Sequence, residues 1–73
     1  MFDNDAVQLV YAGGIISVVG ADNALLTVYN TAGSVVASTA STSMPTSALL
    51  KGVYIVKAVT DMGNVVTKKI VVK

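Results

Sequence analysis

The chain has 73 residues, with five basic against four acidic residues and no cysteine or histidine. This length allows one small domain, and the near-neutral charge argues against nucleic-acid binding, which needs a basic face. The lack of cysteine excludes disulfides and thiolate metal sites, and an apolar fraction of 53% with few charges argues against disorder.

The N-terminal third predicts a hairpin of two strands, 6–11 and 15–19, around the turn residues Gly13-Gly14. Residues 2–5 are Phe-Asp-Asn-Asp, which is acidic where a signal peptide would be basic. The uncharged stretch 9–21 is broken by glycines and is shorter than the roughly 18 to 20 residues that a membrane-spanning helix needs. The sequence therefore predicts neither a signal peptide nor a transmembrane segment.

The middle third predicts two further strands, 24–29 and 34–39, separated by an Asn-Thr-Ala-Gly turn. The segment 37–47 is rich in serine, threonine and alanine, and we interpret it as a poorly paired edge strand followed by a loop. Pro45 fits this interpretation because proline cannot donate a hydrogen bond to a strand ladder. A short strand is expected over 46–49.

The last third predicts the two longest strands, 53–60 and 65–72, with a turn at residues 61–64. Tyr54, Val56 and Ala58 alternate with less apolar positions, a period of two that places Tyr54 and Val56 in the core. No stretch keeps an apolar stripe at helical spacing beyond about two turns. About seven short strands at this spacing predict an all-β fold, a small antiparallel immunoglobulin-like β-sandwich.

No residue pattern indicates catalysis or the binding of a cofactor or metal. Asp3 and Asp5 could form a carboxylate pair, but a solvated terminus is the simpler interpretation. Asp22 and Asp61 lie in turns, where aspartate is common, and are too scattered for a calcium loop. Without histidine or a fitting lysine–serine pair, no serine or threonine is an activated nucleophile. We predict no enzyme, no catalytic residue, no cofactor and no metal.

Three motifs in the second half of the chain carry a resemblance to a known family. Residues 28–36 read V-Y-N-x-x-G-x-x-V, residues 49–56 read L-x-x-G-x-Y-x-V, and residues 68–73 form a lysine-bearing strand, KKIVVK. In order, spacing and terminal position, these motifs resemble the C-terminal sorting domain, type A-like, of the type IX (Por) secretion system of Bacteroidetes. The Tyr-Pro-Asn-Pro-like motif that often opens the family is absent, and residues 2–5 stand in its place.

The resemblance implies a non-catalytic signal that directs a cargo protein across the outer membrane to the cell surface. The chain 1–73 would then be a single C-terminal module of a larger secreted protein, whose signal peptide lies upstream of it. The implied partners are the fused cargo, the outer-membrane translocon, and a sortase-like peptidase that removes the module and links the cargo to lipopolysaccharide. The alternative is a structural or adhesive immunoglobulin-like module of a surface protein.

The resemblance places the recognition residues in the last two expected strands. Alternation puts Thr67, Lys69 and Val71 on the wetter face of the final strand. It puts Lys68 on the buried face, so that either its stem reaches the rim or a bulge shifts the register. The lysines could instead only protect an edge strand from aggregation. The expected recognition residues are Gly52, Tyr54, Val56, Lys68, Lys69, Ile70, Val71, Val72 and Lys73.

The high apolar content also predicts self-association. A chain this small cannot bury all of its apolar side chains, and exposed apolar patches tend to find partners. We expect weak homodimers or pairing with the cargo, through an edge strand near 34–39 or at the C-terminus.

Overall fold

The computed structural model describes residues 7–73, and within them it contains strands and no helix. Residues 2–5, for which we considered a carboxylate pair and a signal peptide, lie outside the described residues. The strands are β1 (Gln8–Ala12), β2 (Ile15–Val19), β3 (Ala24–Tyr29), β4 (Val35–Thr39), β5 (Ser43–Pro45), β6 (Gly52–Thr60) and β7 (Val65–Val72).

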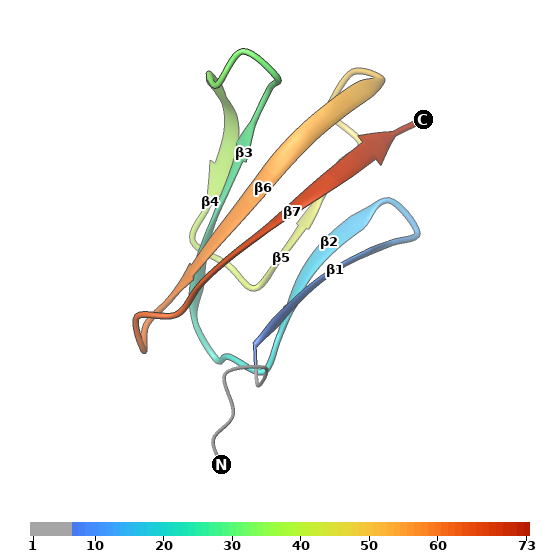
Figure 1. Cartoon of the computed structure of the whole chain (residues 1–73). Coiled ribbons are helices and arrows are strands. Elements are labelled where there is room, and N and C mark those ends of the chain that lie inside the picture. Colours follow the sequence, from blue (N-terminus) through green and yellow to red (C-terminus); the bar gives the residue numbers. More distant parts are fainter. Residues whose placement is uncertain (1–6) are drawn as a thin grey trace.

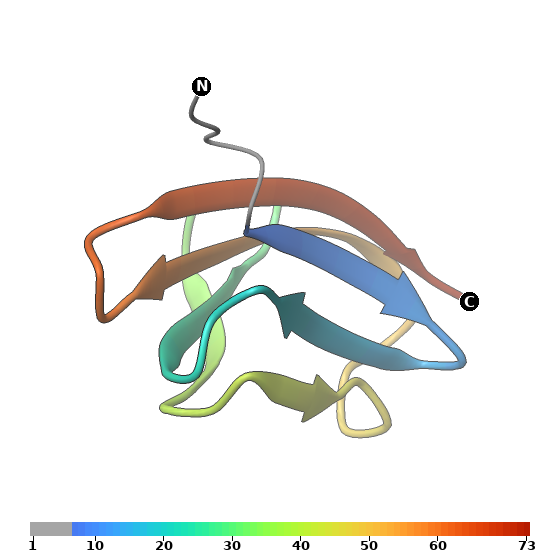
Figure 2. The same ribbon diagram turned by 90° about the horizontal axis from the view of Figure 1, so that it is seen from below.

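The strands form two antiparallel sheets that face each other, which confirms the predicted all-β sandwich (Figure 1). The smaller sheet has the order β1-β2-β5 and the larger one the order β4-β3-β6-β7. At one side of the sandwich the edge strands β1 and β7 run beside each other (Figure 2). The C-terminal strand is therefore an edge of its own sheet and also a neighbour of the opposite sheet.

The core lies between the sheets and follows the period of two that the sequence shows. On β6 every second residue from Tyr54 to Thr60 is buried, and the prediction that Tyr54 and Val56 lie in the core is confirmed. Leu26 and Val28 on β3 are fully buried beside Val56. The remaining buried apolar residues are Val7, Ile16, Val18, Met44, Ala58, Ile70 and Val72.

The strand predicted over 46–49 is wrong, because the chain pairs earlier and then turns. Met44 is buried and lies opposite Ile16, so β5 forms over residues that we interpreted as a loop. The buried Thr46 then donates from its backbone N–H and its hydroxyl to the carbonyl oxygen of Gly14, at 2.9 and 2.8 Å. These two hydrogen bonds fasten Thr46 to the β1–β2 turn, directly after the last residue of β5. Pro45 does lie on an edge strand, as expected.

We expect Leu26→Ala to lower the free energy of unfolding by about 2–5 kcal/mol, because Leu26 is fully buried and the change leaves a cavity. Its neighbour Leu25 points to the other side of β3 and is 48% exposed, so Leu25→Ala should cost less than about 1 kcal/mol. Equilibrium urea denaturation of both variants measures the difference. Equal losses would contradict this assignment of the two faces.

Candidate functional site

The β6–β7 hairpin brings together the residues predicted to serve recognition. The two strands pair without interruption along their length, and eight of the nine residues lie in this one ladder, with Lys73 following directly after β7. The pairs that involve them are Gly52 with Val72, Val53 with Val71, Tyr54 with Ile70, Ile55 with Lys69, and Val56 with Lys68. A set chosen from sequence motifs therefore forms one continuous element.

The hairpin divides these residues between the core and the surface. Tyr54 and Val56 on β6 and Ile70 and Val72 on β7 are buried and pack between the sheets. Their side chains are closed to another protein while the domain is folded. The residues that a partner can touch directly are Lys68, Lys69, Val71 and Lys73, which are all exposed.

Lys68 is exposed although it occupies a core-facing position. It lies opposite the fully buried Val56, and the register of β6 and β7 runs through this pair without a shift. A bulge is therefore excluded as the explanation. Because β7 is an edge strand, the long lysine side chain can extend past the rim of the sandwich and keep its ammonium group in water.

Gly52 and Tyr54 fix the start of β6 in two different ways. The Tyr54 hydroxyl donates a hydrogen bond of 2.7 Å to the carbonyl oxygen of Leu50, which ties the strand to the loop before it. Gly52 has a φ of 152°, a value that residues with a side chain rarely adopt. A Cβ atom at Gly52 would lie 4.0 Å from the Tyr54 ring, an ordinary contact, so the backbone and not the available space requires glycine.

The V-Y-N-x-x-G motif has a structural explanation in the β3–β4 turn. The side-chain oxygen of Asn30 accepts hydrogen bonds of 3.0 Å from the N–H groups of Ala32 and Ser34. Gly33 has a φ of 87° and donates to the Asn30 carbonyl at 3.0 Å. This is a three-residue hairpin loop closed by a glycine in the left-handed region. The motif thus specifies a turn rather than a contact surface.

The β6–β7 turn, predicted at residues 61–64, has the same geometry as the β3–β4 turn. This likeness between the two turns was not predicted from the sequence. Gly63 also has a φ of 87° and donates to the Thr60 carbonyl at 3.0 Å. The Thr60 hydroxyl accepts from the Asn64 N–H at 3.1 Å, in the place of the Asn30 amide oxygen. The shared signal in the sequence is a polar residue three positions before glycine. This turn connects the two strands of the ladder that carries the residues predicted to serve recognition.

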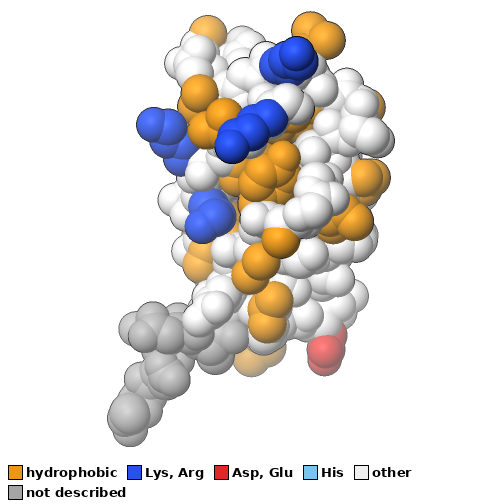
Figure 3. Space-filling model, turned by 90° about the vertical axis from the view of Figure 1, so that its right-hand side faces the viewer, with side chains coloured by type: hydrophobic (Ala, Val, Ile, Leu, Met, Phe, Trp, Pro, Cys, Tyr) orange, Lys and Arg blue, Asp and Glu red, His pale blue; other side chains and the backbone are white. Residues whose placement is uncertain are grey.

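Lysines outnumber acidic residues in the described part of the chain. All five basic residues are lysines between 51 and 73, and the acidic residues within the described part are Asp22 and Asp61, of which Asp61 lies in the β6–β7 turn. Figure 3 shows lysine side chains gathered around apolar ones over the upper part of one face, with an acidic side chain at its lower edge. Residues 7–73 contain no group of three acidic, histidine or cysteine residues that could hold a metal ion. No helix suited to crossing a membrane occurs among them.

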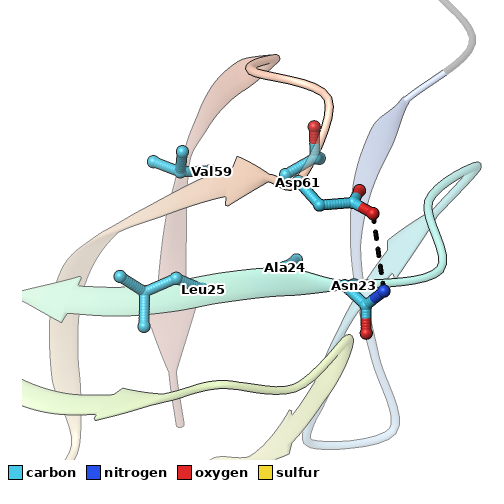
Figure 4. Close-up of a pocket in the computed structure, with 6 residues that line it drawn as sticks. Asn23, Ala24, Leu25, Val59 and Asp61 are labelled. Atoms are coloured by element: carbon cyan, nitrogen blue, oxygen red, sulfur yellow. Dashed lines mark hydrogen bonds between the residues drawn. The ribbon is translucent and has the colours of Figure 1, made fainter.

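An open hollow of about 300 Å³ lies where β3 begins and β6 ends (Figure 4). The Asn23 amide donates a hydrogen bond of 3.4 Å to the Asp61 carboxylate at one end of it, and Leu25 and Val59 project at the other. Ala24 and Thr60 complete its lining. Its apolar lining residues, Ala24, Leu25 and Val59, fit contact with an apolar group.

Comparison with known proteins identifies one family. A family model described as "Secretion system C-terminal sorting domain" matches residues 6–73, which is nearly the whole chain. No curated protein and no solved structure matches the chain.

We expect Gly52→Ala to destabilise the domain by about 1–3 kcal/mol, because alanine must adopt the strained positive φ at this position. Lys51→Ala, at the exposed preceding residue, is the matched control and should change stability by less than about 0.5 kcal/mol. Thermal and urea melts measure both effects. A Gly52→Ala variant as stable as the control would show that the strand can begin without this conformation.

Proposed function

The chain belongs to the secretion system C-terminal sorting domain family, and from this membership we propose that the type IX translocon recognises it through the β6–β7 hairpin. Domains of this family are C-terminal sorting signals for type IX secretion, and the proteins that carry them are secreted to the cell surface or released. The role is that of a signal and not of a catalyst. The family match favours this function over a structural or adhesive module.

The uninterrupted β6–β7 ladder is the observation that supports the hairpin as the recognised element. Its buried residues, such as Tyr54 and Ile70, hold the two strands against the core. Its exposed residues Lys69, Val71 and Lys73 alternate along one side of β7 and its C-terminal end. Binding of a partner to this side would therefore require a folded hairpin as well as these particular side chains.

The further partners follow from the same proposal. The cargo would be fused upstream of the domain, and the domain would be one module of that larger secreted protein. After export to the cell surface, a sortase-like peptidase would cut before the module and attach the cargo to lipopolysaccharide. In this sequence of events the domain is a substrate of the peptidase and contributes no catalytic group.

We also propose weak homodimers through the β4 edge. Of the two edges expected to pair, β7 carries Lys68 and Lys69, which oppose pairing with a copy of itself, whereas β4 carries no charge. Val35 and Val36 are exposed on β4.

We expect sedimentation equilibrium to show dimers whose fraction rises with concentration. Val36→Lys should abolish these dimers, because pairing of two β4 strands would bring the added positive charges of the two copies together. Val19→Lys, a similarly exposed valine on β2, should leave the dimer intact. A monomer at high concentration, or equal effects of the two changes, would contradict pairing through β4.

The sorting function is tested by fusing residues 1–73 to a periplasm-targeted reporter in a host with the type IX machinery. We expect the intact domain to bring the reporter to the surface, and deletion of residues 68–73 to leave it in the periplasm. Because this deletion also removes the buried Ile70 and Val72, deletion of Lys73 alone is the cleaner variant. Loss of Lys73 should reduce surface display while costing less than about 1 kcal/mol of stability.

Lys51→Ala is the control for the loss of one exposed lysine and should export like the intact domain. Surface display is measured with a membrane-impermeant antibody, and thermal melts of each purified domain separate loss of recognition from loss of folding. Failure of the intact domain to export the reporter, or normal export after the six-residue deletion, would show that the sorting assignment is wrong.

A further inference from the structure

The outer face of the larger sheet is apolar toward both ends of its strands, and its middle row, Thr27, Lys57 and Thr67, is polar. No second layer covers this face within the described residues. Because Leu26, Val28 and Val56 point inward, their strand neighbours point to the opposite side of the sheet. Cross-strand pairing sets Leu25 beside Val59 and Tyr29 beside Ile55. We call this surface the outer face and define it by Leu25, Tyr29, Ile55, Lys57, Val59 and Lys69.

The outer face carries positive charge that its own strands leave unbalanced. Lys69 lies opposite Ile55, and Lys57 lies opposite Thr67, so that the two lysines occupy diagonal positions on neighbouring strands. No position of β3, β6 or β7 holds an acidic residue. A surface that covers this face must therefore supply carboxylates if both ammonium groups are to be paired when water is excluded.

The hollow at the end of the outer face supplies a place for an apolar side chain. Leu25 and Val59 line it, and the Asn23–Asp61 hydrogen bond closes its far end (Figure 4). Lys57 is two residues from Val59 on the same side of β6. A bound segment could thus place an apolar group in the hollow and a carboxylate on Lys57 at adjacent positions.

A second copy of the domain does not satisfy these requirements. Packing two outer faces together would bring Lys57 and Lys69 of both copies into one interface, and like charges in such contact are destabilising. The outer side of the smaller sheet exposes Val10, Ile15 and Val19 and has no acidic residue on β1, β2 or β5. Neither face of a second copy therefore supplies the carboxylates that Lys57 and Lys69 would need, which favours an acidic partner of another kind.

We propose that the outer face binds an acidic segment of the type IX translocon, one that carries a carboxylate for Lys57 and an apolar side chain for the Leu25–Val59 hollow. This inference rests on the sorting function and extends the contact surface from the exposed side of the β6–β7 hairpin, which includes Lys69, across β6 to Leu25 on β3. Lys57 and Leu25 lie outside the recognition residues that the sequence motifs name, so their effects can be measured separately.

The test uses the reporter fusion in the type IX host with two matched pairs of variants. Lys57→Glu is compared with Lys51→Glu, the same charge change at an exposed lysine that precedes β6 and is not part of the defined outer face. Leu25→Ser is compared with Ile15→Ser, since the two side chains are 48% and 45% exposed. We expect Lys57→Glu and Leu25→Ser each to reduce surface display by about tenfold, because charge reversal and loss of an apolar anchor weaken docking. The two control variants should export normally.

Thermal melts and a milder variant guard against simple unfolding. Lys57 is half-buried, so Lys57→Gln, which removes the charge without reversing it, should reduce export less than Lys57→Glu at equal stability. If the intact domain exports and the Lys57 and Leu25 variants export equally well, the outer-face proposal is wrong and the sorting function stands. If the intact domain fails to export, both are wrong.

A photo-crosslinking residue in place of Leu25, with Ile15 as the control position, identifies what covers the face during export. We expect a protein adduct from position 25 and none from position 15, with aspartate or glutamate in the crosslinked segment of the translocon. An adduct with a second copy of the domain, an adduct with lipid alone, equal adducts from both positions, or no adduct during normal export would overturn the proposal.

Discussion

The unbroken pairing of β6 with β7 is the interaction on which the rest of this domain depends. Eight consecutive residue pairs join the strands, and β6 also pairs with β3 along most of its length. From Tyr54 to Thr60, every second residue of β6 faces the opposite sheet and is buried. A shift of one residue in this ladder would turn Tyr54 and Val56 outward and Ile55 and Lys57 into the core. The β6–β7 turn, with Gly63 at positive φ, is therefore as important to the fold as any buried side chain.

The same ladder would couple the stability of the domain to the recognition that we propose. Small domains bury a limited share of their surface and are only marginally stable, so the loss of a few core contacts unfolds them. Ile70 and Val72 contribute to that core from the last strand, next to Lys69, Val71 and Lys73 on the surface. A domain whose final strand has not paired has neither a complete core nor an ordered display of these residues. A partner that reads the folded hairpin would thereby accept cargo only when the module is complete.

Strong alternation and turn residues made most of the fold predictable from the sequence. The strands at 15–19, 24–29 and 65–72 have the predicted bounds because each carries a clear apolar period between turn residues. The segment around Pro45 failed because serine, threonine and alanine give little contrast between the two faces of a strand. The structure of this segment depends on a tertiary contact, the two hydrogen bonds from Thr46 to the Gly14 carbonyl, and no local sequence pattern indicates such a contact. The grouping of the recognition residues followed from motifs, but the division between buried and exposed members needed the packing of the two sheets.

The two adjacent lysines of β7 lie on opposite sides of the strand and can therefore serve two different roles. Lys68 is exposed on an edge strand, where its charge discourages pairing with another chain. Lys69 belongs to the other side of the strand and stands opposite Ile55 on the outer face. Two adjacent lysines on a strand necessarily point to opposite faces, so protection of the edge and presentation of charge to a partner do not depend on the same side chain.

Edge protection alone explains Lys68, but it does not explain Lys57, the second lysine of the outer face. Lys57 lies on β6, between β3 and β7, and so protects no edge. The position of Lys57 inside the sheet is thus the feature that favours a partner for this face over protection of the strand.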